Sequence, residues 1–271
     1  MPDGWRWDDT LFRGSAAHYE RGRLPYAPGY AETLAAHLGL DGRGRLLDVG
    51  CGPGTVTRRL APFFREAVGL DPDTDMLAEA ERRGAAGTRW VAGRAEDLPA
   101  GLGRFRTVVF AQSFHWTDRE RVAATVRRML EPGGAVVHIA DLPDPPPATA
   151  PLPRPAPPYD RIAALVRRHL GPLRRAGRGV LVNGTPDGED RVMSGAGLVG
   201  SRRLVVPAGQ VVTRTADDLV AWTFSRSDSA PHLFGDRLAA FETELRALLS
   251  GGPYAEHLRP TEIMIWQAPD P

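Results

Sequence analysis

The chain has 271 residues, of which 42% are hydrophobic and 25% are charged, and these globular proportions exclude a disordered chain. Its 34 basic and 33 acidic residues give a net charge of +1, so no global field favours nucleic acid or an anionic membrane surface as a partner. The single cysteine excludes a disulfide framework and a cysteine-based zinc site. The sequence has no apolar run of about 18 residues and no apolar signal core near Met1, so we expect a soluble cytoplasmic protein.

Five short apolar runs between residues 45 and 141 alternate with segments of helical spacing. The runs predict buried strands, and the apolar spacing predicts helices over 56–64 and 75–83. A third helix is expected after Thr117, which forms a capping-box pattern with Glu120. Strands that alternate with helices imply right-handed βαβ units, and therefore an α/β fold with a doubly wound, mostly parallel sheet. The strands are expected at residues 45–49, 67–71, 89–92, 107–111 and 135–139.

The regular alternation stops after residue 141. Residues 142–158 hold nine prolines in seventeen positions, which is typical of a stiff surface excursion or linker. Residues 171–200 are rich in Gly and Arg and have weak periodicity, which indicates a lid or insertion. Further elements are expected as helices at 159–170, 217–224 and 234–249, and as strands at 204–213 and 262–266.

A glycine-rich turn, Asp48-Val49-Gly50-Cys51-Gly52-Pro53-Gly54, follows the first predicted strand. Glycine permits positive φ and lets a ligand lie against bare backbone. In α/β proteins the turns at this edge of the sheet bind nucleotide-like ligands. The second predicted strand ends in Asp71, 21 residues after Gly50 (71 − 50), where a carboxylate can accept both hydroxyl groups of a ribose.

Five segments in this order resemble those of class I S-adenosylmethionine (SAM)-dependent methyltransferases, over roughly Tyr19 to Asp141. The glycine-rich turn is similar to the first motif of that family, and Val68–Asp73 is similar to its ribose-binding strand end. Three further segments resemble its adenine-contact segment, the segment beneath the sulfonium and the turn before strand five: Gly93–Pro99, Phe110–Trp116 and Leu130–Gly134.

The resemblance implies a Rossmann-like sheet of seven strands, with the last strand antiparallel. It also implies SAM as cofactor, S-adenosylhomocysteine (SAH) as product, and an acidic contact to the adenine amine from Glu96 or Asp97. The candidates for cofactor binding are Asp48, Gly50, Cys51, Gly52, Gly54, Asp71, Pro72, Met76, Glu96, Asp97, Ala111, Gln112, Trp116, Tyr19 and Arg23.

Residues 17–26 resemble the entry segment of many small-molecule methyltransferases, which folds over the cofactor. Tyr19 would pack on the site, and Arg23 would meet the methionine carboxylate or an acidic substrate. The alternative is an ordinary solvated segment. We therefore predict four parts, namely an N-terminal helical lid at 1–40, a SAM-binding core at 41–141, a Pro- and Arg-rich insertion over the substrate site at 142–203, and a C-terminal part that completes the sheet at 204–271.

His115 follows the fourth predicted strand, at the edge where the methyl group would emerge. A neutral imidazole there can take a proton from a hydroxyl group as that group attacks the methyl carbon. The alternative is that His115 and Trp116 only shape the wall of the site. No HxH or HxxxH spacing occurs, so we predict no metal site.

Three other enzyme classes fit these motifs less well than small-molecule methylation does. A nicotinamide dinucleotide needs G-x-G-x-x-G for its pyrophosphate, whereas the glycines here are Gly50, Gly52 and Gly54. Methyltransferases of exocyclic base amines resemble one another in an Asp/Asn-Pro-Pro-aromatic motif, where this chain has Ala-Gln-Ser-Phe at 111–114. Cys51 lies in the turn, where a small residue is required, so we do not expect it to be the nucleophile of a cytosine carbon methyltransferase.

We therefore expect methyl transfer to a small molecule in bacterial specialised metabolism, most readily to oxygen, with nitrogen and carbon left open. Two alternatives stay open, namely a SAM- or SAH-binding protein that catalyses a non-methylating reaction, and an interaction protein that docks partners on its proline-rich segment. We expect no nucleic-acid or membrane partner, and both a monomer and a homodimer are compatible with the sequence.

Overall fold

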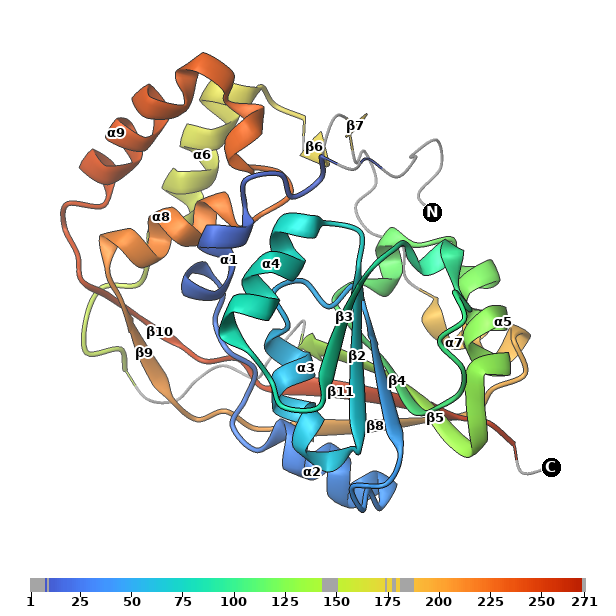
Figure 1. Cartoon of the computed structure of the whole chain (residues 1–271). Coiled ribbons are helices and arrows are strands. Elements are labelled where there is room, and N and C mark those ends of the chain that lie inside the picture. The colour runs from blue at the N-terminus through green and yellow to red at the C-terminus, as the bar shows by residue number, and fades with distance from the viewer. Residues whose placement is uncertain are drawn as a thin grey trace.

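The computed structural model describes residues 8, 10–142, 151–173, 175–176, 179–180 and 188–269. Its centre is a seven-stranded sheet with helices on both faces (Figure 1). The strand order is β3-β2-β1-β4-β5-β11-β8. The strand bounds are β1 Arg45–Val49, β2 Glu66–Asp71, β3 Thr88–Ala92, β4 Phe105–Ala111, β5 Leu130–Asp141, β8 Val199–Val206 and β11 Thr261–Gln267.

The sheet has the predicted mixture of parallel and antiparallel pairs. The first five strands pair in parallel, with Leu47 of β1 opposite Val68 of β2 on one side and Val108 of β4 on the other. Strand β11 runs antiparallel to both β5 and β8. The predicted Rossmann-like sheet with an antiparallel last strand is therefore confirmed. The strand order reverses between β1 and β4, and such a reversal places a crevice at the carboxyl edge of an α/β sheet.

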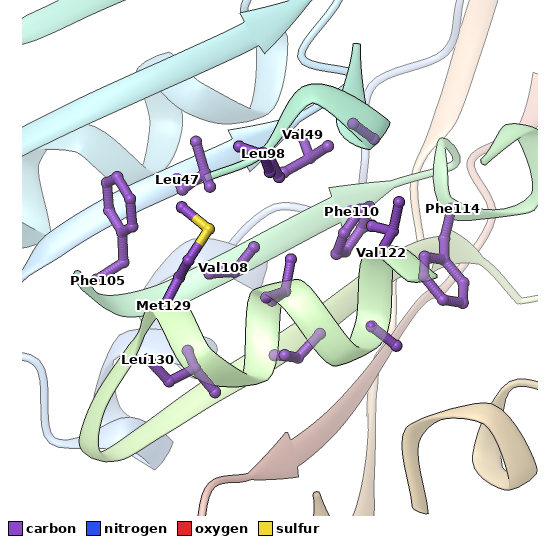
Figure 2. Close-up of a cluster of buried hydrophobic side chains, with 14 of the residues drawn as sticks. Leu47, Val49, Leu98, Phe105, Val108, Phe110, Phe114, Val122, Met129 and Leu130 are labelled. Atoms are coloured by element: carbon purple, nitrogen blue, oxygen red, sulfur yellow. The ribbon is translucent and has the colours of Figure 1, made fainter. Parts of the chain in front are cut away.

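Two apolar layers hold helices against the sheet. Helices α2 (Tyr30–Leu38) and α3 (Thr55–Leu60) cover one face, and α5 (Arg119–Met129) and α7 (Glu189–Gly195) cover the other. Figure 2 shows side chains of β1 and β4 packed against α5, with Val108, Val122 and Phe105 all fully buried. Helix α4 (Thr74–Arg83) follows β2, and the side chain of its N-cap, Asp73, accepts hydrogen bonds from the backbone of Asp75 and Met76.

A separate helical cap is built from the C-terminal part of the chain. It contains α6 (Tyr159–Leu170), α8 (Ala216–Phe224) and α9 (Leu238–Leu248) around their own apolar cluster. Within it, the rings of Phe234 and Phe241 stack with their centroids 4.0 Å apart. The N-terminal helix α1 (Ala16–Gly22) lies between α8 and α4 (Figure 1), so the N-terminal segment joins the cap to the sheet domain.

The remaining elements are short. Strands β9 (Val211–Arg214) and β10 (Tyr254–His257) form an antiparallel pair, as do β6 (Arg175–Ala176) and β7 (Gly179–Val180). Single turns of 3-10 helix occur at Ala61–Phe63, Ala95–Asp97, Phe114–Trp116, Pro231–Leu233 and Gly235–Arg237.

Three predictions about individual elements are wrong. The N-cap of α5 is Asp118, whose carboxylate accepts from the backbone of Arg121, whereas the hydroxyl of Thr117 donates to the carbonyl of Phe114. The strand expected at 204–213 is two strands in different sheets, because the chain turns between Val206 and Val211. The last long helix begins at Leu238, after a separate 3-10 turn.

The two ends of the segment 142–203 pack against different parts of the molecule. Of its proline-rich part, residues 143–150 lie outside the described residues, and Pro155 accepts a backbone hydrogen bond from Ala255 beside the cap. At its other end, Val192 and Met193 of α7 belong to the main core, and β8 begins at Val199. Among the described residues, no helix is both long and apolar enough to cross a membrane.

Candidate functional site

A cavity that is partly open to solvent lies at the carboxyl edge of the sheet. Its walls come from the chain segments that follow β1, β2, β3 and β4, and from the N-terminal segment around α1. These walls include residues that are far apart in the sequence, such as Phe12, Asp71 and Trp116. This cavity is called the edge cavity below.

The glycine-rich turn supplies a bare stretch of backbone to the edge cavity. Gly50 has φ +70°, and a Cβ there would lie 2.5 Å from the Cβ of Ser113. Gly52 has φ +53°, and a Cβ there would have no heavy atom of the protein within 4 Å. Gly52 therefore leaves free space for a ligand, whereas Gly50 lets the turn after β1 approach the loop after β4.

Gly54 has a different role in the structure. It has φ +74°, and a Cβ there would lie 2.4 Å from the indole of Trp90 on β3. Gly69 of β2 meets the same ring, since its added Cβ would lie 2.5 Å from Trp90. Both glycines make room for this ring, and Gly54 does not line the edge cavity.

Asp71 ends β2 and is held at the wall of the edge cavity by backbone donors. One carboxylate oxygen accepts from Gly52 N at 2.8 Å, and the other accepts from Asp73 N at 2.9 Å. Burial raises the pKa of Asp71 to about 6, against the opposing effect of these two backbone hydrogen bonds. Each carboxylate oxygen has a second lone pair, so the group can still accept from a ligand hydroxyl.

Asp48 lies beneath the turn and lines neither the edge cavity nor the larger cavity beside it. It is fully buried, and one carboxylate oxygen accepts from the hydroxyl of Thr57 at 2.6 Å. Burial raises the pKa of Asp48 to about 7, and the nearby carboxylate of Asp71 adds to the rise. Its contacts therefore join β1 to α3, which follows the turn.

The two acidic candidates of the third segment differ in their surroundings. Glu96 lines the edge cavity, and one of its carboxylate oxygens accepts from Asp118 N at 2.8 Å. Asp97 lines neither cavity, and its carboxylate accepts from Arg94 N at 3.0 Å in a local cap. Geometry therefore favours Glu96 over Asp97 as a ligand contact.

The loop after β4 contributes a strained residue. Gln112 lines the edge cavity and has φ +57°, a backbone conformation that residues other than glycine and asparagine rarely adopt. The next residue, Ser113, donates from its hydroxyl to the carbonyl of Val49 at 2.5 Å. The loop is thus tied to the end of β1, and strain of this kind is concentrated at functional sites.

A second and larger cavity adjoins the first and shares part of its wall, including Tyr19, Gln112 and Trp116. His115 and Arg23 line only this larger cavity. The Arg23 guanidinium lies over the Tyr19 ring at 5.1 Å and donates to the hydroxyl and the carbonyl of Ser225 at 3.0 and 2.9 Å. This larger cavity is called the outer cavity below.

Most predicted residues meet around these two cavities. The edge cavity contains Gly50, Gly52, Asp71, Pro72, Met76, Glu96, Ala111, Gln112, Trp116 and Tyr19. Cys51 lines the outer cavity, and burial raises the pKa of its thiol. Asp48, Gly54 and Asp97 line neither. Among the described residues, no three His, Cys, Asp or Glu side chains are grouped as metal ligands.

Sequence reasoning did not find several residues of the edge cavity. Leu11 and Phe12 come from the segment before α1, and no pattern in the sequence marks them. Asp73 and Ser113 had a local signal, since Asp73 caps α4 and Ser113 follows β4 at the expected edge. Both lie within the segments that resemble family motifs, Val68–Asp73 and Phe110–Trp116.

Comparison with known proteins places the matched region around this site. A family model described as a methyltransferase domain matches residues 46–134. An uncharacterized methyltransferase of Mycobacterium tuberculosis is 38% identical over 130 residues, which cover 48% of this chain and 51% of that protein. A malonyl-(acyl-carrier protein) O-methyltransferase of Enterobacter lignolyticus is 33% identical over 128 residues, covering 47% of this chain and 50% of that protein. The chain therefore spans about half the length of these curated relatives.

A likeness among solved structures extends over nearly the whole chain. The cyclase SpnF superposes with a TM-score of 0.52 and covers 97% of this chain and 94% of its own, at 16% sequence identity. At this identity the likeness concerns the fold alone.

The buried carboxylate of Asp48 predicts a pH dependence of stability. Its pKa is higher in the folded chain than in the unfolded chain, so the folded state binds more protons between about pH 4 and pH 7. The free energy of unfolding should therefore fall as pH rises through this window. Asp48→Asn cannot ionise at this position. Between pH 5 and pH 8, we expect its free energy of unfolding to fall by on the order of 2 kcal/mol less than that of the wild type.

Urea unfolding of the wild type and of Asp48→Asn at pH 5, 6, 7 and 8 measures this difference. Asp97→Asn is the control, because Asp97 is not buried in the core and should leave the pH profile unchanged. Parallel profiles for the wild type and Asp48→Asn would show that Asp48 is ionised at no cost.

Proposed function

We propose that the chain is a class I SAM-dependent methyltransferase that transfers a methyl group from SAM to a small-molecule acceptor, which the matching methyltransferase domain and the order of the sheet support. The single observation that carries this proposal is the edge cavity. It brings the open turn at Gly52, the carboxylate of Asp71 and the carboxylate of Glu96 into one wall. An open backbone and two acceptor groups match a ligand with a flexible charged end, a ribose and an adenine.

The residues fit SAM in a defined arrangement under this proposal. The turn from Gly50 to Gly52 lies beside the methionyl part, Asp71 accepts from the ribose hydroxyls, and Glu96 accepts from the adenine amine. Leu11, Phe12 and Tyr19 cover the site from the N-terminal side. When bound, SAM supplies a methyl group activated by a sulfonium. The chain's own contribution is then to align the acceptor with that group and to exclude water.

The acceptor is proposed to occupy the outer cavity. His115 lines this cavity, and a neutral imidazole there takes the proton that an attacking hydroxyl group loses. Arg23 presents a fixed guanidinium on the opposite segment, suited to a carboxylate of the acceptor or of the methionyl part. We propose oxygen as the acceptor atom, which is supported by the likeness to the O-methyltransferase of Enterobacter lignolyticus.

A non-methylating reaction is the second candidate function. It is favoured by one observation, the likeness in fold to a protein named as a cyclase. Because a fold does not fix a reaction, consumption of SAM in the presence of an acceptor separates the two. We also propose a cytoplasmic location, which the lack of any apolar run of about 18 residues supports, and an acceptor that belongs to specialised metabolism.

Substitution at Asp71 tests the position of the cofactor. Asp71→Asn keeps the size of the side chain but removes one acceptor group and the negative charge. We expect it to weaken SAH binding by on the order of 2 kcal/mol, or roughly 30-fold, because ribose hydrogen bonds are lost. Isothermal calorimetry measures the affinity, and Asp97→Asn, which changes the same group outside the cavity, should stay within about twofold of the wild type.

Equal affinities for the wild type and Asp71→Asn would place the ribose elsewhere. Unfolding of each variant is measured as well, since Asp71 also anchors the backbone of Gly52.

Substitution at His115 separates the acceptor side from the cofactor side. His115 lines only the outer cavity, whereas its neighbour Trp116 lines both cavities. We expect His115→Ala to leave SAH affinity within about twofold, and Trp116→Ala to weaken it at least about tenfold. The same calorimetric titration measures both variants. A large loss of SAH affinity in His115→Ala would make this residue part of the cofactor wall.

A further inference from the structure

Glu20 on α1 joins the N-terminal segment to two helices that border the edge cavity. One carboxylate oxygen lies 3.0 Å from Nη2 of Arg58 on α3, and the other lies 2.5 Å from Nη1 of Arg83 on α4. The three side chains are partly buried, with 32% of Glu20, 19% of Arg58 and 32% of Arg83 exposed. Charge-assisted pairs in such surroundings are stronger than those on an open surface.

Both arginines connect Glu20 to the wall of the cavity. Arg58 also donates to the carbonyl of Pro53 at 2.8 Å, inside the glycine-rich turn. Arg83 lies in the last turn of α4, whose first turn contains the cavity residue Met76. A movement of Glu20 would therefore shift Arg58 next to the turn on one side and Arg83 at the end of α4 on the other.

Helix α1 is fixed to the helical cap as well. A Cβ on Gly22 would lie 2.4 Å from the backbone of Ala221, so α1 and α8 touch backbone to backbone. Arg214 donates to the carbonyl of Gly22 at 2.6 Å, and the hydroxyl of Ser15 donates to the carbonyl of Phe224 at 2.7 Å. Helix α1 therefore belongs to the cap, and its ion pairs through Glu20 reach from the cap to the sheet domain.

The charged residues of α1 divide between these two partners. Arg21 pairs with Asp217 and Asp218 on α8, within the cap. Among the residues that the structure describes, Glu20 forms ion pairs only with arginines of α3 and α4, across the boundary between the cap and the sheet domain. The neighbouring Tyr19 lines both cavities, so the Glu20 pairs lie at the point where α1 covers the proposed cofactor.

We propose that Glu20 is a positioning residue that holds α1 and the cap over the cofactor through its ion pairs with Arg58 and Arg83. These two ion pairs, called the clasp below, set how long the cofactor stays bound. The inference rests on the proposed function, because it takes SAM or SAH as the ligand of the edge cavity. Opening the clasp breaks two ion pairs and lets Tyr19 leave the cavity wall. Since the pairs are partly exposed, added salt weakens them, and release of the ligand becomes faster with ionic strength.

The test is the rate at which SAH leaves the full chain. Protein loaded with labelled SAH is chased with an excess of unlabelled SAH, at low and at high salt. We expect Glu20→Gln to release SAH about tenfold faster than the wild type and to lose the dependence on salt. Arg83→Gln should act in the same direction, and the double variant should release SAH no faster than Glu20→Gln, because both changes open one clasp.

Glu79→Gln is the matched control. Glu79 pairs with the same Arg83, at 2.7 Å, but it lies on α4 itself and does not reach α1. We expect release from this variant to stay within about twofold of the wild type. The melting temperature of every variant is measured, because a purely structural role of Glu20 would lower it without changing the release rate.

Unchanged release from Glu20→Gln, or an equal acceleration in Glu79→Gln, would overturn the clasp while leaving the proposed function intact. Failure of the wild type to bind SAH would instead contradict the proposed function itself. If Glu20→Gln does not fold, Arg83→Gln decides the matter, with an acceleration of about threefold expected and an unchanged rate counting against the clasp.

Discussion

The candidate site depends on how the glycine-rich turn is fastened to the end of β2. The backbone N–H groups of Gly50 and Cys51 donate to the carbonyl of Leu70 at 2.7 and 3.1 Å. The next residue of β2, Asp71, adds a third hydrogen bond between the strand end and the turn, because its carboxylate accepts from Gly52 N. These bonds place an acidic group and an open backbone side by side, and the turn that makes them has positive φ at Gly50 and Gly52. The edge cavity exists because the chain can turn back on itself at this point.

The sheet could be predicted from the sequence because its signals are local. Each of the first five strands is an apolar run next to a turn or helix signal, and all five were placed within a few residues of their observed bounds at one or both ends. The later elements lack such signals. Helix α7 lies in a stretch rich in Gly and Arg, and its apolar residues Val192 and Met193 show their role only when packed in the core.

The site was predictable in its position more than in its individual contacts. A motif states which residue types occur together, but it does not say which of them face a ligand. Gly54 illustrates this, because its small size is required by Trp90, a ring from a strand more than thirty residues later in the sequence. The covering residues Leu11 and Phe12 are harder still to find, since their place depends on how α1 packs on the cap. Contacts between distant segments are therefore the part that sequence reasoning did not reach.

The two halves of the proposed reaction are distributed between two parts of the chain. Residues of the matched region, 46–134, form most of the edge cavity, whereas the outer cavity also draws on the N-terminal segment and on residues such as Arg226 and Leu258. Under the proposed function, the cofactor would therefore be recognised mainly by the region shared with relatives. The choice of acceptor would depend on the cap, which lies outside that region.

Calorimetric titration of the wild-type chain with SAM, SAH and NAD⁺ tests the central claim most directly. The account predicts saturable binding of SAM and SAH at one site per chain, with Kd values of roughly micromolar order, and no binding of NAD⁺. A folded chain that binds neither SAM nor SAH, or that binds NAD⁺ in their place, would contradict it.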